Sequence, residues 1–262
     1  MIDRKLLERL FQTGGAEDFR QLVQKELAEH KILYQVDERQ NIFSLVYPDR
    51  PILCAHMDTV QTEQDRANAS TIQVTHKAVE GLSVLGADDK CGVYIILHLL
   101  QQGKKFNFIF TASEEIRFQD SITQFLEEND IRKFPFALVL DSPYNRDIQC
   151  SCRNFGSKEF ENDIFRIGKD LGFHPLLERE DEANTASDAD MIQKYINCAN
   201  ISVGYYYYHK AKEYALLADI QRSEQFVERI LYQTSRISRK RPGKKISEVC
   251  FDDGTSASIF EE

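Results

Sequence analysis

Residues 106–141 read FNFIFTASEEIRFQDSITQFLEENDIRKFPFALVLD, and this stretch decides the fold. It begins with the apolar, β-rich run 106–112 and ends with a second such run at 136–141. Both runs are apolar at successive positions, as is typical of parallel strands covered on two faces. Between them, 118–130 carries apolar residues at helical spacing. A strand, a helix and a strand in this order predict an α/β fold, a three-layer sandwich around a mixed, mostly parallel central sheet.

The rest of the chain continues this alternation in both directions. Helices are predicted, from apolar residues at helical spacing, at 2–11, 16–30, 91–102, 157–171, 187–195 and 210–237. Strands are predicted at 31–36 and 41–46, which form a hairpin, and at 51–55, 71–75 and 200–208. The polar segment 61–70 is expected to be a surface loop.

Composition limits the possible partners. The formal net charge of −9 argues against a nucleic-acid partner, because phosphate binding requires a basic face. No stretch approaches the ~18 apolar residues of a membrane span, so we expect no membrane partner. The N-terminus lacks the apolar centre of a secretory signal, and the six cysteines contain no C-x-x-C pair. We therefore expect reduced thiols and a cytoplasmic protein.

Two local features of the sequence each allow more than one interpretation. Cys150 and Cys152 share one face of an expected strand, where structural packing is favoured over a metal or redox pair. From Arg236 the chain carries the basic run RISRKRPGKK. A solvated basic tail is favoured there over a nucleic-acid arm.

Acidic and imidazole side chains recur at the ends of apolar runs. An apolar run that ends in such a group indicates a buried strand that delivers it to the edge of the sheet. Ligands of open α/β sheets bind at that edge, and imidazole with carboxylate is a ligand set for Zn²⁺ or a similar ion. The groups are, in chain order, His56, Asp58, Asp88, Glu114, Glu115, Asp141 and His209.

Three of these residues suggest roles through their spacing alone. Asp58 follows His56 by two positions and is placed to accept the second ring N–H of that histidine, which would fix its tautomer. Glu114 and Glu115 are adjacent. One of them would ligate a metal and the other would take a proton from water, and two metals would activate that water.

These segments resemble the dizinc aminopeptidase and carboxypeptidase clan, which includes peptidase T, the glutamyl aminopeptidases and the bacterial zinc aminopeptidases. The first two motifs, AHMDTV at 55–60 and GADDK at 86–90, are the most specific. SEE at 113–115, LD at 140–141 and a histidine followed by a glutamate four positions later (209 and 213) match the remaining motifs. The resemblance implies a zinc-exopeptidase-like fold and spans 52–213.

The resemblance also implies a role for each residue. Asp88 would bridge two divalent ions, zinc first, with cobalt or manganese as alternatives. His56 and Asp141 would complete one shell, and Glu115 and His209 the other. Glu114 would be the general base and then the acid for the leaving amine, while Asp58 would orient His56. The resemblance further implies a cis Asp88–Asp89 peptide.

Part of the clan carries a dimerisation domain between the fourth and fifth motifs. Only about 70 residues separate Asp141 from His209 here, and about 30 separate Asp58 from Asp88. Neither interval holds a further domain of the usual size. We therefore expect 1–262 to be a single catalytic domain with the basic tail from about 236. The sequence leaves open whether the chain forms a homo-oligomer.

The favoured function is a metallo-exopeptidase that hydrolyses the N-terminal peptide bond of short peptides with a water bridging two divalent metals. A hydrolase of N-acyl amino acids or other small amides is the first alternative. A non-catalytic descendant that binds a ligand or partner is the second. A carboxylate would hold the substrate's free amine, with Glu213, Asp188 and Asp190 as candidates. An ordinary helix N-cap at Ser187 and Asp188 is the competing interpretation of that segment.

Overall fold

The computed structural model describes residues 1–115, 120–149, 156–175 and 187–239. The expected Cys150 and Cys152 pair, and the basic tail beyond Arg239, lie outside these ranges. The helices are α1 (Arg4–Gln12), α2 (Ala16–Glu29), α3 (Glu63–Asn68), α4 (Ala87–Gln101), α5 (Asp120–Glu128), α6 (Lys158–Gly168), α7 (Asp188–Ile192) and α8 (Leu217–Gln233). The strands are β1 (Gln35–Val36), β2 (Ile42–Ser44), β3 (Ile52–His56), β4 (Gln73–Val74), β5 (Ala78–Glu80), β6 (Asn107–Thr111), β7 (Ala137–Ser142), β8 (Asp147–Gln149), β9 (His174–Pro175), β10 (Cys198–Ser202), β11 (Tyr205–Tyr206) and β12 (Tyr214–Leu216).

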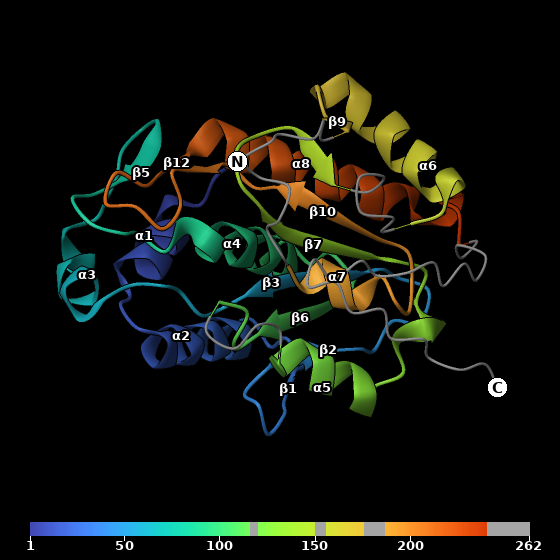
Figure 1. Ribbon diagram of the computed structural model, residues 1–262, viewed down its shortest axis with the longest axis horizontal. Coiled ribbons are helices and arrows are strands. Elements are labelled where there is room, and N and C mark those ends of the chain that lie inside the picture. The colour runs from blue at the N-terminus through green and yellow to red at the C-terminus, as the bar shows by residue number, and fades with distance from the viewer. Residues whose placement is uncertain (116–119, 150–155, 176–186, 240–262) are drawn as a thin grey trace, which may run out of the picture.

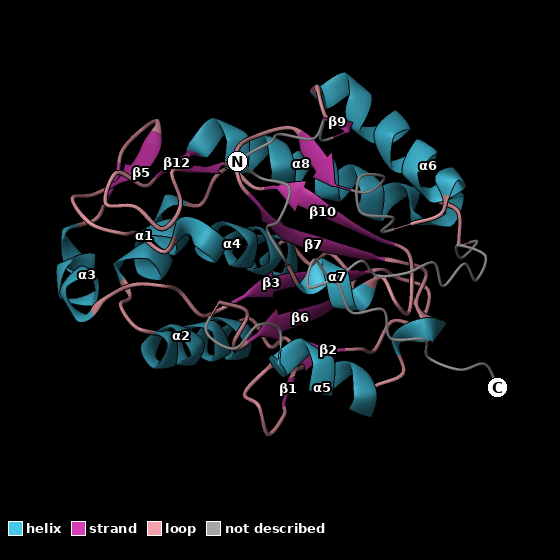
Figure 2. Cartoon of the chain, viewed as in Figure 1, coloured by secondary structure: helices cyan, strands magenta, loops and turns pink. Residues whose placement is uncertain are grey.

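The central sheet has eight strands in the order β1-β2-β6-β3-β7-β10-β8-β9 within the described ranges. Its middle strands β6, β3, β7 and β10 are mutually parallel. Antiparallel pairs join β1 to β2, β2 to β6 and β8 to β10. The predicted mixed, mostly parallel α/β sheet is confirmed, and Figures 1 and 2 show its arrows crossing the middle of the molecule.

Helices cover both faces of this sheet, and alternation along the middle strands assigns the faces. One face packs against α1, α2, α4, α6 and α8, and the other against α5 and α7 (Figure 1). The residues of β3 and β7 that face the first group are Leu53, Ala55, Leu138 and Leu140. Those that face the second group are Ile52, Cys54, Ala137 and Val139. Both faces are apolar, which explains the continuous apolar runs in the sequence.

A small second sheet, with order β11-β12-β5-β4, lies beside the first, and it corrects two predictions. The expected strand 200–208 breaks at Gly204, whose φ of +93° turns the chain out of the central sheet. The expected helix 210–237 begins only at Leu217, because Tyr214–Leu216 pairs with β5. This strand pairing joins residues more than 130 positions apart in sequence, and it overrode the local helical pattern.

The expected surface loop at 61–70 is also corrected, since it contains the short helix α3. The side chain of Thr62 accepts the N–H of Asp65, and the N–H of Thr62 donates to the Asp65 carboxylate at 2.9 Å. This reciprocal cap stabilises a helix that has no buried residue. The spacing of Thr62 and Asp65 was the sequence signal for it.

Helix α4 lies close against the sheet, and its N-terminus points toward the carboxyl ends of the parallel strands (Figure 1). Gly92 permits this approach, because a Cβ there would lie 2.1 Å from the carbonyl oxygen of Leu140 in β7. In the part of the chain that the structure describes, no helix is long and apolar enough to cross a membrane.

Candidate metal centre

The carboxyl ends of the parallel strands bring the first ligand candidates together. His56 is the last residue of β3 and pairs in register with Thr111, the last residue of β6. Asp141 lies near the end of β7, the strand on the other side of β3. Parallel strands end at one edge of the sheet, so residues far apart in sequence become neighbours there.

His56, Asp88 and Asp141 form one group, which we call the first triad. The Nε2 atom of His56 lies 2.9 Å from Oδ1 of Asp88 and 3.5 Å from Oδ1 of Asp141. All three side chains are at least nine-tenths buried. Three potential ligand atoms thus converge on one buried point.

Asp88, Glu115 and His209 form a second triad. The Nε2 atom of His209 lies 2.5 Å from Oε1 of Glu115 and 3.3 Å from Oδ2 of Asp88. Asp88 therefore contributes Oδ1 to the first triad and Oδ2 to the second. Within each triad the potential ligand atoms lie within 4.8 Å of one another. One carboxylate is therefore shared by two groups, each of which could hold a metal ion.

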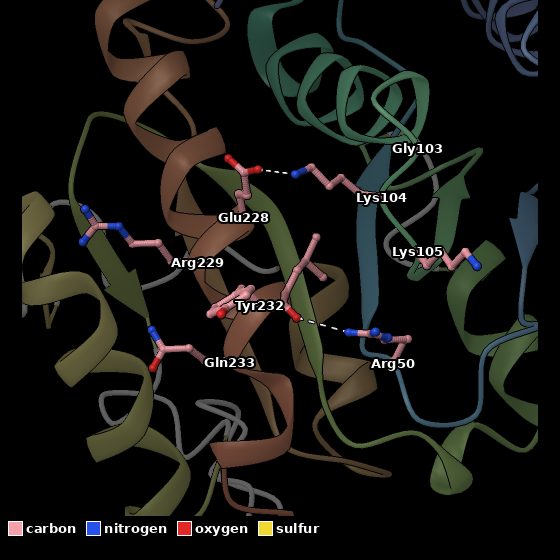
Figure 3. A pocket seen from close by; sticks show the side chains of 9 residues that line it. Arg50, Gly103, Lys104, Lys105, Glu228, Arg229, Tyr232 and Gln233 are labelled. Atoms are coloured by element: carbon pink, nitrogen blue, oxygen red, sulfur yellow. Dashed lines mark hydrogen bonds and ion pairs between the residues drawn. The ribbon is translucent and has the colours of Figure 1, made fainter.

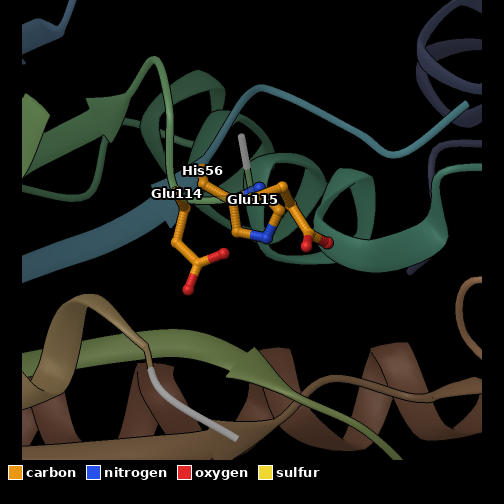
Figure 4. Close-up of side chains that lie close together, drawn as sticks. All are labelled: His56, Glu114 and Glu115. Atoms are coloured by element: carbon orange, nitrogen blue, oxygen red, sulfur yellow. The ribbon is translucent and has the colours of Figure 1, made fainter. Parts of the chain in front are cut away.

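Glu114 occupies a different position from Glu115. His56, Glu114 and Glu115 also bring one ligand atom each within 4.8 Å. In the view of Figure 4 the two carboxylates lie on either side of the imidazole ring, so the adjacent residues face different parts of the site. Glu115 contacts His209, which leaves Glu114 beside the first triad.

Asp58 connects His56 to the glutamate pair. The Nδ1 atom of His56 lies 3.0 Å from the backbone oxygen of Asp58 and 3.5 Å from its carboxylate. The carboxylate of Asp58 was expected to accept the ring N–H of His56, but the backbone carbonyl of Asp58 lies closer to that nitrogen. The carboxylate accepts the backbone N–H groups of Glu114 and Glu115 at 2.9 and 3.0 Å. Asp58 thereby fixes the backbone of the pair, which spacing alone did not indicate.

The electrostatics of the site favour added positive charge. Burial, followed by the charges of Asp141, Asp188 and Glu115, raises the pKa of Glu114 to about 9. Burial and the charge of Asp88 raise the pKa of Asp141 to about 8. Burial is the larger cause of both rises and repulsion between carboxylates adds to it, and a bound divalent ion would oppose both effects.

The two histidines respond to the same carboxylates. Burial opposes protonation of His209, but hydrogen bonds to Asp88 and Glu115 raise its pKa to about 10. For Asp88, burial acts to raise the pKa, yet hydrogen bonds from His209 and His56 lower it well below its ordinary value. Asp88 is thus ionised beside two imidazoles, which suits a shared metal ligand.

The start of α4 has an irregular backbone that places Asp88. The Asp88–Asp89 peptide is cis, as expected, and both residues have non-helical dihedral angles. The buried Asp89 carboxylate accepts the N–H of His56 at 3.2 Å and that of Gly92 at 2.9 Å. Asp89 therefore links β3 to α4 rather than joining either triad.

Glu213, proposed as the carboxylate for a substrate amine, has another function in this structure. It is 2% exposed, and its carboxylate accepts the backbone N–H groups of Leu85, Gly86 and Ala87 at 2.6, 2.9 and 3.1 Å. Burial and the charge of Asp88 raise its pKa to about 7, although these hydrogen bonds oppose the rise. Both of its oxygens therefore accept backbone N–H groups of the segment before Asp88.

Asp188 and Asp190, the other two amine-binding candidates, also contact protein groups, although Oδ1 of Asp188 is buried without a hydrogen-bond partner among the described residues. The Asp188 carboxylate is buried beneath the strand ends, where it accepts the Thr111 hydroxyl at 2.6 Å. Asp190 accepts the N–H of Ser187 at 2.9 Å in a reciprocal cap at the start of α7. The helix-cap interpretation of this segment therefore accounts for Ser187 and Asp190.

Two further residues support Asp141 and were not identified from the sequence. Asn200 of β10 accepts the N–H of Asp141 at 3.2 Å and donates to its carbonyl at 3.0 Å. The buried Tyr205 donates its hydroxyl to the Asp141 carboxylate at 3.4 Å. Both lie in the apolar run 200–208, where no periodic signal distinguishes them from core residues.

A basic cavity of about 490 Å³ lies at the opposite edge of the sheet (Figure 3). Arg50, which lines it, precedes β3, whereas His56 ends that strand. Arg50 donates to the carbonyl oxygen of Leu231 at 3.4 Å, and Lys104 pairs with Glu228. Basic groups beside the C-terminal ends of α4 and α8 stabilise the helix dipoles, which accounts for this cavity's charge.

Comparisons with known proteins identify the fold. No protein-family model matches the chain, and no curated protein sequence does. The TET1 peptidase of Pyrococcus horikoshii superposes with a TM-score of 0.64 at 14% identity, over 87% of this chain and 98% of that one. The aminopeptidase PepT of Bacillus cereus gives 0.65 at 13% identity, over 88% and 98%. A tripeptidase of Staphylococcus aureus gives 0.62 at 14%, over 90% and 100%.

Such low identities carry the fold and not the activity. The superposed structures show that the chain has the fold of the TET1 peptidase and the aminopeptidase PepT.

Proposed function

We propose that this chain is a metal-dependent exopeptidase that hydrolyses the N-terminal peptide bond of short peptides. The observation that carries the proposal is the pair of triads that share Asp88, with the carboxylate of Glu114 beside them. The structures with the same fold include proteins described as an aminopeptidase and a tripeptidase, which supports the same class of reaction.

The donor set fits two divalent ions, zinc first. His56 and Asp141 would hold one ion, Glu115 and His209 the other, and Asp88 both. Mixed imidazole and carboxylate donors suit Zn²⁺. The raised pKa values of Glu114 and Asp141 indicate that their ionised forms lack a fully compensating positive charge in the part of the chain that the structure describes. When bound, the two ions would activate a water molecule lying between them and neutralise charge that develops on the substrate carbonyl.

Glu114 is proposed to move the proton. Its carboxylate is not needed to complete either triad and lies beside His56, so it is free to accept a proton from water once bound ions favour its ionised form. The same group then donates that proton to the leaving amine. Asp58, through its two backbone hydrogen bonds, holds Glu114 in place for both transfers.

The substrate is proposed to be small. Of the carboxylates considered for amine recognition, Glu213 and Asp190 accept backbone N–H groups, and within the described ranges Asp188 uses only one oxygen, which accepts the Thr111 hydroxyl. This observation keeps hydrolysis of N-acyl amino acids or other small amides as the second candidate, because such substrates present no free amine.

The free thiols of Cys54, Cys91 and Cys198 support a reducing, cytoplasmic location.

Metal analysis joined to a substrate screen tests the proposal. We expect two divalent ions per chain, and activity on amino-acid anilides or short peptides that chelation removes and zinc, cobalt or manganese restores. Activity confined to N-acetyl amino acids would favour the second candidate. Purified protein that binds no divalent ion at neutral pH would contradict both.

A further inference from the structure

The segment 85–88 carries the shared ligand, but its own sequence does not hold it in place. Gly86 stands at the N-cap of α4 with a φ of +67° and provides no side-chain cap. Asp88 has φ −80° and ψ 103°, outside the helical range. A helix start without a local cap leaves backbone N–H groups to be satisfied from elsewhere.

Glu213 satisfies them from the other side of the site. Its three hydrogen bonds to the N–H groups of residues 85–87 bind this segment to the loop that carries His209, four residues earlier. Asp88 and His209 belong to the second triad. One buried carboxylate therefore fixes the spacing between the two loops that supply those ligands.

Lys90 holds the same segment by its carbonyl side. Its side chain is 1% exposed, and the ammonium donates to the backbone oxygens of Leu85 at 3.2 Å, Thr13 at 2.9 Å and Phe11 at 3.4 Å. An ammonium has three donors, so these carbonyls satisfy it completely. It also lies 5.5 Å from the ring centroid of Phe19. Lys90 thus joins the segment to the end of α1.

Asp88 consequently has one buried support on each side of its backbone. Glu213 engages the N–H groups of the preceding residues, and Lys90 engages the carbonyl of Leu85. Neither group belongs to a triad, and both are buried among protein atoms. Their charges attract each other across the segment.

We propose that Glu213 and Lys90 are positioning residues that set the place of Asp88 relative to His209 and thereby the affinity of the second triad for its ion. This inference rests on the metal centre proposed above. Removal of an outer partner of a metal ligand typically weakens binding by about 10–100-fold. Asp88 is shared by both triads, whereas His209 belongs to the second alone, so the loss should be larger for the ion of the second triad.

The test uses the full chain stripped of metal and titrated with Zn²⁺ by calorimetry and with Co²⁺ by visible absorption. The variants are Glu213→Gln, which keeps the size but loses one acceptor oxygen, and Lys90→Met, which keeps the apolar stem. The matched control is Glu26→Gln. Glu26 is another 2%-exposed glutamate, and it accepts hydrogen bonds from Arg9 and Gln101 instead of segment 85–88.

We expect two binding events in the unsubstituted chain. Glu213→Gln and Lys90→Met should weaken at least one of them about 10–100-fold and change the Co²⁺ spectrum of the affected site. Glu26→Gln should leave both events unchanged. Unchanged affinities in Glu213→Gln and Lys90→Met, or equal losses in Glu26→Gln, would overturn the inference. If Glu213→Gln does not fold, Lys90→Met decides it.

Amide hydrogen exchange of the metal-free chain separates this inference from the proposed function. Segment 83–90 should exchange faster in Glu213→Gln and Lys90→Met than in the unsubstituted chain, and not in Glu26→Gln. Unaltered exchange there would overturn the positioning role. If the unsubstituted chain binds no ion while exchange rises as expected, the proposed function fails and the structural support of Asp88 by these residues stands.

Discussion

Glu114 and Glu115 show how neighbouring residues of one type acquire different chemistry. The carboxylate of Glu115 contacts His209 in the second triad. Glu114 is placed beside the first triad, where burial and three other carboxylates raise its pKa to about 9. Identical side chains in one motif are therefore separated by their surroundings alone, and this separation supports the proposed division between ligand and base.

Replacement of Glu114 by glutamine tests the proposed proton transfer. Glu114→Gln keeps the size and backbone contacts but removes the group that accepts a proton. We expect kcat to fall by about 10²–10⁴-fold while two ions per chain are retained. Turnover assays beside metal analysis provide the measurement. Equal activity in the variant would remove Glu114 from its assigned role.

Asp58 offers a second test at this scale. Asparagine has one acceptor oxygen where the Asp58 carboxylate has two, so Asp58→Asn cannot accept both the N–H of Glu114 and that of Glu115. We expect kcat to fall by about 10–100-fold. Asp37→Asn in the β1–β2 turn is the control for the loss of one carboxylate oxygen. The Asp37 carboxylate accepts the backbone N–H groups of Arg39 and Asn41 through Oδ1 and the side-chain amide of Asn41 through Oδ2. A similar loss of activity in the control would contradict the assignment.

The packing of α4 on β7 determines where the second motif lies relative to the strand ends. The close approach depends on Gly92, since a Cβ there would meet the Leu140 carbonyl oxygen at 2.1 Å and the Asp89 carboxylate at 2.5 Å. Backbone cannot move aside as a flexible side chain can. A larger residue at this position must push the helix away from the sheet, and Asp88 would move with it.

Gly92→Ala is therefore expected to destabilise the protein by about 1–3 kcal/mol, the usual cost of overpacking. Denaturant unfolding monitored by circular dichroism measures this change. Gly103→Ala at the other end of α4 is the comparison, because nothing lies within 4 Å of its Cβ position and only its φ of +76° opposes substitution. That variant should lose about 1–2 kcal/mol from backbone strain and keep its metal affinity, whereas Gly92→Ala should lose affinity as well. Unchanged metal binding in Gly92→Ala would contradict this link.

At the scale of the whole molecule, charge at the site links stability to pH. In the metal-free protein Glu114, Asp141 and His209 all have a folded pKa above the ordinary one, about 9, 8 and 10 against 4.5, 3.8 and 6.5. A raised folded pKa stabilises the protein below the unfolded pKa, and that stabilisation is lost as pH rises through the folded value. The pKa of Asp88 is lowered instead, so this carboxylate is ionised at every pH at which the other three groups lose their protons.

The metal-free protein should therefore become less stable between about pH 6.5 and 9. We expect its melting temperature to fall by at least about 2–4 °C over this window, the equivalent of ~1 kcal/mol. Saturating zinc should abolish the decline, because the ions replace the protons that these groups lose. Glu114→Gln should flatten part of the metal-free curve. A metal-free melting temperature that rises toward pH 9 would contradict this account.

Much of this architecture followed from local pattern. The central strands β3, β6 and β7, helix α4 and the α/β class were all predicted, because continuous apolar runs and helical spacing are local consequences of burial. The loop expected at 61–70 failed for a local reason, because the cap formed by Thr62 and Asp65 begins helix α3 there. Two other segments failed because distant parts of the chain govern them. Tyr214–Leu216 became a strand because β5 pairs with it, and Gly204 turned the chain between two sheets.

By itself, the sequence determined the α/β class and the set of ligand candidates, because strand ends and motif spacing are written in consecutive residues. Only the tertiary structure decided that the Asp58 carboxylate accepts the backbone N–H groups of the glutamate pair and that Glu213 accepts those of the segment before Asp88. These roles depend on hydrogen bonds across 56 and more residues of sequence. The direction of a buried carboxylate is set by whichever donors the folded chain places around it, and one-dimensional spacing does not contain that information.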